Sequence, residues 1–133
     1  MTTRIAPPVS EASAPFWDAS REQRFVLPWS EARGGWLWYP REVDPDHPDS
    51  AIEWREASGE GTVYAAAVHH RAGPGRDEAD GLYVVAIIEL AEGVRMMSNV
   101  VGCPPDDVTV GMPVRLVWHP LSDGRNLPQF TPA

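Results

Sequence analysis

The chain has 133 residues and a formal net charge of −8, and 43% of its residues are apolar, which suffices for one packed domain with a small appendage. Its eleven basic residues are all arginine and form no run, so the basic stripe of a nucleic-acid-binding surface is missing. The single cysteine, Cys103, excludes an internal disulfide and a cysteine-based zinc site, and no stretch approaches the roughly 20 apolar residues of a membrane span.

Residues 1–14 are small, polar and interrupted by prolines, which predicts a flexible arm. A short helix is predicted from about residue 15 to residue 23, because Ser13 can cap its start and Pro15 suits its first turn. Phe16 and Trp17 are adjacent and therefore point in different directions. One of them can pack inward while the other faces a partner.

Two strands joined by a turn at residues 33–35 are predicted from the stretches RFVLPW and GGWLWYP. An acidic loop with prolines follows, and AIEWREA then predicts a strand with Ile52 and Trp54 on one face. Two clusters with two-residue gaps, Ser30-x-x-Arg33 and Asp44-x-x-His47, flank the aromatic part of this segment. The spacing is that of the cysteine pairs in a structural zinc ribbon, yet none of the four residues is cysteine.

From residue 58 onward the pattern is that of β-strands. The stretch GTVYAAAVHH alternates, which predicts that Val63, Ala65, Ala67 and His69 share one face. LYVVAIIEL is apolar throughout and predicts a central strand covered on both faces, and three further strands follow it with glycine turns between them. Five short strands in about 75 residues favour a small closed barrel of the OB type, with an open sandwich as the alternative.

No nucleophile or general base stands in a recognisable catalytic motif. Cys103 precedes two prolines in a connection, where a small buried filler is the favoured interpretation over a nucleophile. His69 and His70 occupy adjacent strand positions and point to opposite faces, so they cannot form one site together, and a structural role is favoured for each. We therefore assign no catalytic residue.

The stretches PFWDASREQRFVL, SGEGTVYAAAVHHR, YVVAIIELAEGVRMMSNVVGCPPDDVTVGMPVRLVW and LPQFTPA together resemble the acyl-CoA-associated OB-fold proteins known as domain of unknown function 35. The likeness covers the chain from about Pro15 to Ala133. Its most specific parts are Ser58-Gly59-x-Gly61 at the start of the barrel and the NVVG and GMPV runs. The resemblance implies a mainly β protein: an arm at 1–14, a helix and ribbon-like segment at 15–57, and a five-stranded OB-fold domain at 58–133.

In that family the ribbon carries two cysteine pairs that bind zinc. The four cysteine positions fall here on Ser30, Arg33, Asp44 and His47, so the resemblance implies a degenerate, metal-free zinc-ribbon hairpin with no bound cofactor. Two substitutes for the metal are considered. Arg33 can pair with Asp44, although such a pair contributes little if it is exposed. An aromatic cluster can also hold the hairpin together in place of the metal; its members would be Trp29, Trp36, Trp38 and Tyr39.

Members of the family pair with thiolase-like proteins, among them the sterol-carrier-protein-x-type aldolases of steroid side-chain breakdown. The resemblance thus implies a non-catalytic subunit of a complex that cleaves a steroid acyl-coenzyme A thioester by a retro-aldol reaction. A two-plus-two heterotetramer in the cytoplasm is expected, with no membrane or nucleic-acid partner. The expected partner-interface residues are Phe16, Trp17, Trp36 and Trp38. Coenzyme A contacts, if this chain makes them, require arginine, and Arg71, Arg76 and Arg95 are the residues proposed.

Three other functions are weighed against this one. The first is a stand-alone small-molecule or acyl-coenzyme A binding protein or hydrolase, which turnover by the isolated chain would reveal. The second is nucleic-acid binding, which the OB fold alone suggests and the net charge opposes. The third is a self-assembling structural protein.

Overall fold

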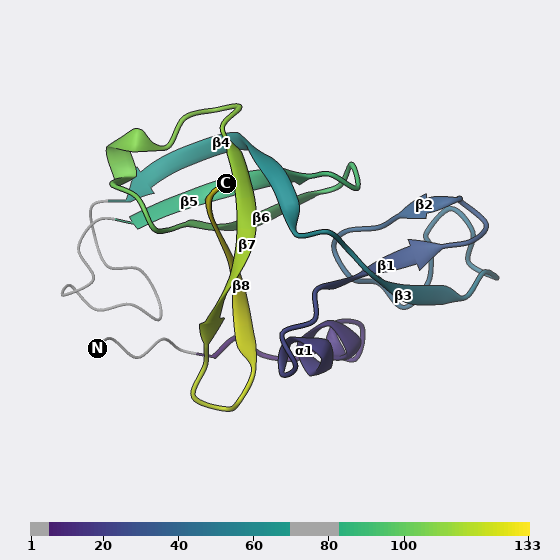
Figure 1. Cartoon of the computed structure of the whole chain (residues 1–133). Coiled ribbons are helices and arrows are strands. Elements are labelled where there is room, and N and C mark those ends of the chain that lie inside the picture. The colour runs from purple at the N-terminus through teal and green to yellow at the C-terminus, as the bar shows by residue number, and fades with distance from the viewer. Residues whose placement is uncertain (1–5, 70–82) are drawn as a thin grey trace.

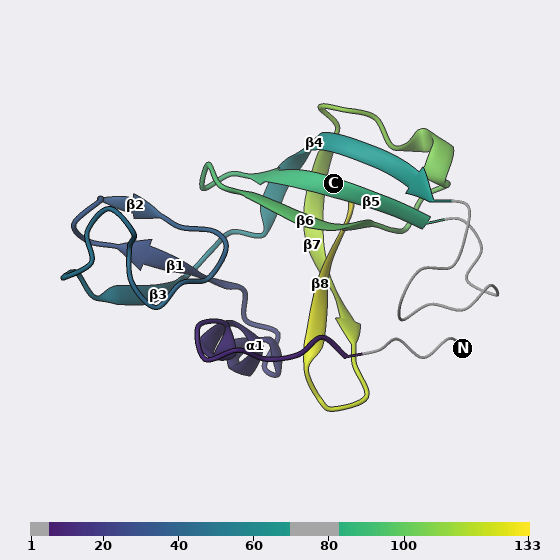
Figure 2. The same cartoon turned by 180° about the vertical axis from the view of Figure 1, so that it is seen from behind.

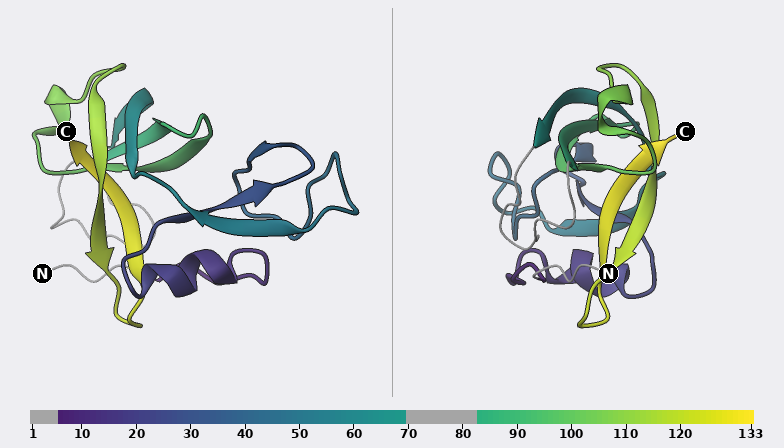
Figure 3. Two further views of the ribbon diagram at one scale, coloured as in Figure 1. Left: turned by 45° about the vertical axis from the view of Figure 1, so that its right-hand side comes forward. Right: turned by 90° about the vertical axis from the view of Figure 1, so that its left-hand side faces the viewer.

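The structure, a computed structural model, describes residues 6–69 and 83–133 of the chain. Its described part consists of a short helix, a small three-stranded sheet and a closed five-stranded barrel, in that order along the sequence (Figure 1). The small sheet lies to one side of the barrel in both opposite views (Figure 2). The helix contacts the first strand of the small sheet and the last strand of the barrel, so it bridges the two (Figure 3).

Helix α1 spans Ala14–Ser20, and Phe16 and Ser20 are its buried residues. The prediction that it continues to residue 23 is wrong: its end is a turn in which Gln23 adopts a left-handed backbone with φ of 56°. Ser13 does occupy the N-cap position, but its side chain bonds to Ser10 instead of capping the helix. The Ser20 hydroxyl donates to the Trp17 carbonyl oxygen at 2.6 Å, which satisfies one of the acceptors in the last turn.

The small sheet has the strand order β2-β1-β3, with β1 at Val26–Ser30, β2 at Gly35–Trp36 and β3 at Ile52–Glu56. Both pairings are antiparallel, and Trp29 of β1 stands opposite Trp36 on one side and Glu53 on the other. Along β3, Ile52 and Trp54 are half-buried while the intervening residues are exposed, as the alternation predicted. We call this sheet, together with the loops at 31–34 and 37–51, the ribbon.

The barrel is closed in the strand order β4-β5-β6-β8-β7, with β7 pairing back onto β4. Only the β6–β8 contact is parallel. A 3-10 turn, η2 (Pro105–Asp107), lies between β6 and β7. The five strands are β4 (Glu60–His69), β5 (Tyr83–Leu90), β6 (Arg95–Val100), β7 (Pro113–Pro120) and β8 (Asn126–Pro132). The expected mainly β fold with a short first helix and a five-stranded OB-type barrel is therefore confirmed, and the open sandwich is excluded.

The core of the barrel is formed by alternate residues of β5 together with residues of the other four strands. β5 pairs with both β4 and β6, which confirms it as a central strand. The prediction that both faces of β5 are covered is wrong, because Val85 and Ile87 on its outer face are only half-buried. An apolar outer face that solvent reaches is more typical of a contact surface than of a solvated strand.

Strand β4 contains a β-bulge at Tyr64. The residues on either side of it, Val63 and Ala65, pair with consecutive residues of β5. Side chains change face at the bulge, and Val68 therefore packs against the same core as Val63. The prediction that the odd-numbered residues 63–69 share one face is consequently wrong.

Two glycines at the start of the barrel explain why the sequence SGEG stands there. Gly59 is buried, has a φ of +76°, and accepts a hydrogen bond from the backbone N–H of Leu116 at 2.7 Å. A Cβ on Gly61 would lie only 2.7 Å from the carbonyl oxygen of Glu89. Glycine is required at the first position by the backbone conformation and at the second by close approach of the neighbouring strand.

Within the described ranges 6–69 and 83–133, no helix is long and apolar enough to cross a membrane.

Candidate functional site

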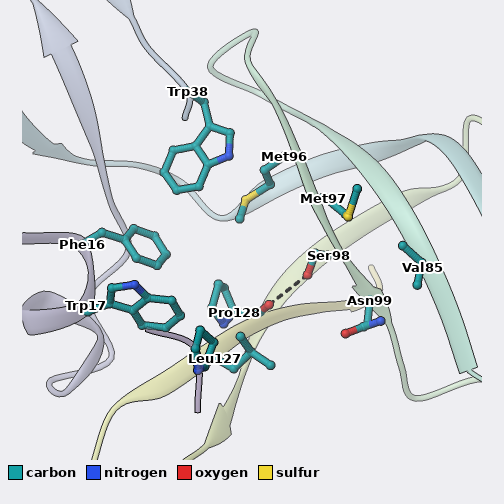
Figure 4. A pocket seen from close by; sticks show the side chains of 11 residues that line it. Phe16, Trp17, Trp38, Val85, Met96, Met97, Ser98, Asn99, Leu127 and Pro128 are labelled. Carbon is teal, nitrogen blue, oxygen red and sulfur yellow. Dashed lines mark hydrogen bonds between the residues drawn. The ribbon is translucent and has the colours of Figure 1, made fainter. Parts of the chain in front are cut away.

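An apolar groove of about 350 Å³ opens where α1, the ribbon, β6 and β8 come together (Figure 4). Ser98 and Asn99 in its lining are already engaged in hydrogen bonds: the Ser98 hydroxyl donates to the Pro128 carbonyl and the Asn99 amide to the Val84 carbonyl, each at 2.9 Å, whereas the buried indole N–H of Trp38 has no partner among the described residues. The groove thus presents apolar surface and suits an apolar side chain or acyl group. It is lined by Pro7, Phe16, Trp17, Trp38, Val85, Met96, Met97, Ser98, Asn99, Leu127 and Pro128.

Aromatic rings form one wall of the groove. Phe16 lies at its centre, with its ring centroid 5.2 Å from that of Trp17 and 5.3 Å from that of Trp38. Phe16 also packs edge-on against Phe25, and Phe25 packs against Trp118 of β7. This row of rings joins the helix, the ribbon and the barrel, so the shape of the groove depends on how these three parts are held together.

Arg125, which immediately precedes β8, packs against the outer side of this wall. Its guanidinium carbon lies 4.7 Å from the centroid of Trp17, and the side chain is almost fully buried. Its Nε donates to the Asp123 carboxylate and its Nη2 donates to the Pro7 carbonyl, both at 2.7 Å. Burial acts to raise the pKa of Asp123, but the hydrogen bonds from Arg125 outweigh it and hold that pKa below its ordinary value.

The structure brings three of the four predicted partner residues to this groove. Phe16 is only 3% exposed, so within this chain it is a wall residue and not an open surface. Trp17 and Trp38 are half-buried and line the groove. Trp36 lies elsewhere: its ring packs edge-on against Trp29 on the ribbon, with centroids 5.3 Å apart. That these residues bind a partner stays a prediction.

Met97 is a groove residue that sequence reasoning missed. It is 57% exposed, which is high for a methionine, and it stands opposite Ile87 on the outer face of the β5–β6 pair. Because Met96 is buried, the adjacent Met97 must point outward. The doubled methionine on a predicted strand was the available signal, since one of the two had to face away from the core.

Of the three arginines proposed for coenzyme A, Arg71 and Arg76 lie outside the described residues. Arg95 is at the β5–β6 hairpin, where its Nε donates to the Glu89 carboxylate at 3.0 Å. Its guanidinium carbon lies 3.7 Å from the ring centroid of Tyr64, the bulged residue of β4. Arg95 and Met97 are two residues apart on one strand and so lie on the same outer face.

The four positions that correspond to zinc ligands meet in the ribbon, and three of their side chains interact. Arg33 donates from Nε and Nη2 to the two carboxylate oxygens of Asp44, at 2.9 and 2.7 Å. The Ser30 hydroxyl accepts from the backbone N–H of Arg33 at 3.2 Å. His47 donates its backbone N–H to the Asp44 carbonyl, but its side chain is exposed. The Arg33–Asp44 pair considered from the sequence is present, and its carboxylate is fully buried.

Arg33 holds the pKa of the Asp44 carboxyl well below its usual range, and hydrogen bonds from the Asp46 backbone and from Ser30 add to this effect against the opposing effect of burial. The prediction that these four aromatic rings form one cluster is wrong. The four rings form two pairs among the described residues, Trp29 with Trp36 and Trp38 with Tyr39.

The described residues contain no cluster of three or more histidine, cysteine or acidic side chains that could hold a metal ion. Cys103 is half-buried and packs against the core. His69 stacks on Tyr83 with ring centroids 5.0 Å apart, whereas His70 lies outside the described residues. Neither Cys103 nor His69 belongs to the groove.

A family model described as the C-terminal OB-fold domain of ChsH2 matches residues 54–119 of this chain. Among solved structures, a chain of the Ltp2-ChsH2(DUF35) aldolase is 33% identical, with a TM-score of 0.84, and the match covers 96% of this chain and 98% of that one. A DUF35-family protein of unknown function from Sulfolobus solfataricus has a TM-score of 0.65 at 13% identity, which shows the fold alone.

Curated relatives match in sequence. A probable enoyl-CoA hydratase alpha subunit of Thermomonospora curvata is 33% identical over 98% of this chain. The 3-oxo-4,17-pregnadiene-20-carboxyl-CoA hydratase alpha subunit of Mycobacterium tuberculosis is 34% identical over 90%. This chain spans only 40% and 37% of the lengths of those two proteins. A DUF35 domain-containing scaffold protein of Methanocaldococcus jannaschii is 38% identical over 67% of this chain and 64% of its own length.

Proposed function

The chain belongs to the DUF35 OB-fold family that includes the ChsH2 C-terminal domain, and on this premise we propose that it is a non-catalytic accessory subunit of a thiolase-like acyl-coenzyme A aldolase or thiolase. The observation that carries the proposal is the likeness to the chain of the Ltp2-ChsH2(DUF35) aldolase. That likeness covers nearly the full length of both chains, including the helix and ribbon that lie outside the barrel.

The proposed reaction is retro-aldol cleavage of a steroid acyl-coenzyme A thioester, with the bond-breaking groups supplied by the partner. Two names support this reaction: the similar solved structure is called an aldolase, and the name of the Mycobacterium tuberculosis relative contains a steroid coenzyme A thioester. The chemistry of the groove is consistent with an accessory role, because its described lining is mostly apolar and contains no side chain suited to act as a general base.

In this proposal the partner docks over the groove and the outer face of β5 and β6. Trp17, Trp38 and Met97 are the partly exposed apolar anchors, and Phe16 supports the first two from behind. Trp36 extends the contact onto the ribbon. Arg95, on the same face as Met97, is proposed to approach a phosphate of coenzyme A, as are Arg71 and Arg76. A two-plus-two assembly in the cytoplasm completes the proposal.

The proposal is tested by assaying the thiolase-like chain from the same host on steroid acyl-coenzyme A, alone and with this chain. The mixture is expected to release the ketone product faster than the thiolase-like chain alone, and this chain alone is expected to release none. Turnover by this chain alone would instead support a stand-alone acyl-coenzyme A hydrolase or lyase. Equal rates with and without this chain would count against an accessory role.

A further inference from the structure

Leu37 is buried at the start of the loop at 37–51, and the single buried residue in the remainder of that loop, 39–51, is an aspartate. Asp44 has a side-chain exposure of 0%, while Tyr39 and Val43, the loop's large apolar residues, are 55% and 45% exposed. A loop of this length with no strand or helix of its own needs an anchor to hold one conformation. Within 39–51 no large apolar side chain is buried, so this part of the loop is held by polar contacts to Asp44.

Those contacts use both carboxylate oxygens. Oδ2 accepts from Arg33 Nε, and Oδ1 accepts from Arg33 Nη2 and from the backbone N–H of Asp46, all within 2.9 Å. Arg33 Nη2 also reaches the Asp46 carboxylate at 2.6 Å. The guanidinium therefore binds the loop in the two-pronged geometry that makes arginine–carboxylate pairs strong and directional.

Arg33 itself is fixed on the other loop of the ribbon. Its backbone N–H donates to the Ser30 hydroxyl, and Ser30 is fully buried at the end of β1. The pair thus ties the turn after β1 to the loop before β3, which are the two places where a zinc ribbon has its cysteine pairs. A zinc ion does not fit this donor set, because a permanent cation occupies the centre and the Asp44 oxygens are committed to it.

We propose that the Arg33–Asp44 ion pair takes the structural place of a zinc ion, so that the ribbon folds without metal and is insensitive to chelators. The pair supplies what the metal supplies in a ribbon, namely a charged link between two loops that have little apolar core of their own. The ribbon is also supported by the pairing of β1 with β2 and β3, by the buried side chains of Leu27 and Leu37, and by aromatic contacts of Trp38 with Phe16 and of Trp29 with Trp36.

The first experiment measures metal content and thermal unfolding of the full chain with and without EDTA. Substoichiometric zinc and an unchanged midpoint are expected. About one equivalent of zinc per chain, or a midpoint lowered by EDTA, would overturn the proposal. A variant with Ser30→Cys, Arg33→Cys, Asp44→Cys and His47→Cys is expected to bind about one zinc per chain and to become sensitive to EDTA.

A second experiment keeps the proposal testable if the four-cysteine variant does not fold. Asp44→Asn keeps the size of the side chain but removes its charge, and Asp46→Asn is the matched control on the same arginine, with a 72% exposed side chain. Amide hydrogen exchange of residues 44–50 is expected to speed up about tenfold or more in Asp44→Asn and to change little in Asp46→Asn, with β5 protected in both. Equal exchange in the two variants would contradict the proposal.

Discussion

The guanidinium of Arg125 lies over the indole ring of Trp17, with 4.7 Å between the guanidinium carbon and the ring centroid. Arg125 immediately precedes β8 and Trp17 belongs to α1, so this contact joins the helix near the start of the chain to the last strand of the barrel. The same side chain also holds the N-terminal arm through the Pro7 carbonyl. One wall of the groove therefore depends on a contact between residues more than 100 positions apart.

Replacing Arg125 with methionine is expected to lower the free energy of unfolding by about 2 kcal/mol, because the stack and the hydrogen bonds to Asp123 and Pro7 are lost together. Arg125→Lys keeps the charge but not the planar fork, and it should recover only part of the loss. Urea unfolding of the three proteins measures the difference. A lysine variant as stable as the wild type would show that charge alone explains the contact.

Met97→Asp is expected to weaken binding of the thiolase-like partner by about tenfold or more, since it places a carboxylate in the centre of an apolar contact. Val110 provides a matched control, because it is 71% exposed and lies outside the groove. Val110→Asp should leave the dissociation constant unchanged. Calorimetric titration of both variants against the partner decides the matter, and equal losses would argue against the groove as the docking surface.

Gly61→Ala is expected to destabilise the barrel by about 2 kcal/mol, because the new methyl group would collide with the Glu89 backbone, which cannot move without breaking the β4–β5 ladder. Gly35→Ala is the control, since a Cβ there would meet only ordinary contacts at 3.7 Å or more from the Arg33 side chain. Thermal unfolding of both variants measures the contrast. A Gly61 variant as stable as the Gly35 variant would mean that the two strands separate more easily than the structure indicates.

Ionisation of Asp44 should make the thermal stability of the protein depend on pH in the acidic range. The pKa of Asp44 in the folded protein lies below the ordinary aspartate value of about 3.9, so the unfolded chain takes up the proton first as pH falls. The contribution of Asp44 is therefore complete near neutral pH and is lost as pH falls below about 4. Thermal midpoints measured from pH 7 to pH 2.5 should show the difference between wild type and Asp44→Asn shrinking over the acidic part of this range. A constant difference would contradict this account.

The sequence predicted the architecture well where pattern and composition carry the information. Glycine turns and apolar runs predicted the five barrel strands, and the charges at positions 33 and 44 suggested their ion pair. The bulge at Tyr64 was missed because one extra residue leaves no mark in an alternating run of small residues. The change of face that follows could only be seen from the pairing with β5.

The groove was predicted only in part, because it is assembled from distant segments. Adjacent Phe16 and Trp17 had to diverge, but the sequence did not determine which one was buried. The stack of Arg125 on Trp17 settles this, since it places Trp17 at the rim and leaves Phe16 inside. Met97 could not be assigned to the groove from the sequence, because its position opposite Ile87 follows from the register of the β5–β6 pairing, which no local sequence pattern specifies.

The central claim, that this chain is an accessory subunit, is tested most directly by purifying the tagged full-length chain from its native host and identifying by mass spectrometry what accompanies it. The account predicts a thiolase-like protein in stoichiometric amount, retained through size-exclusion chromatography and lost in the Met97→Asp variant. A chain that purifies without a thiolase-like protein would contradict it, and a partner retained equally by the Met97→Asp variant would contradict the groove as the docking surface.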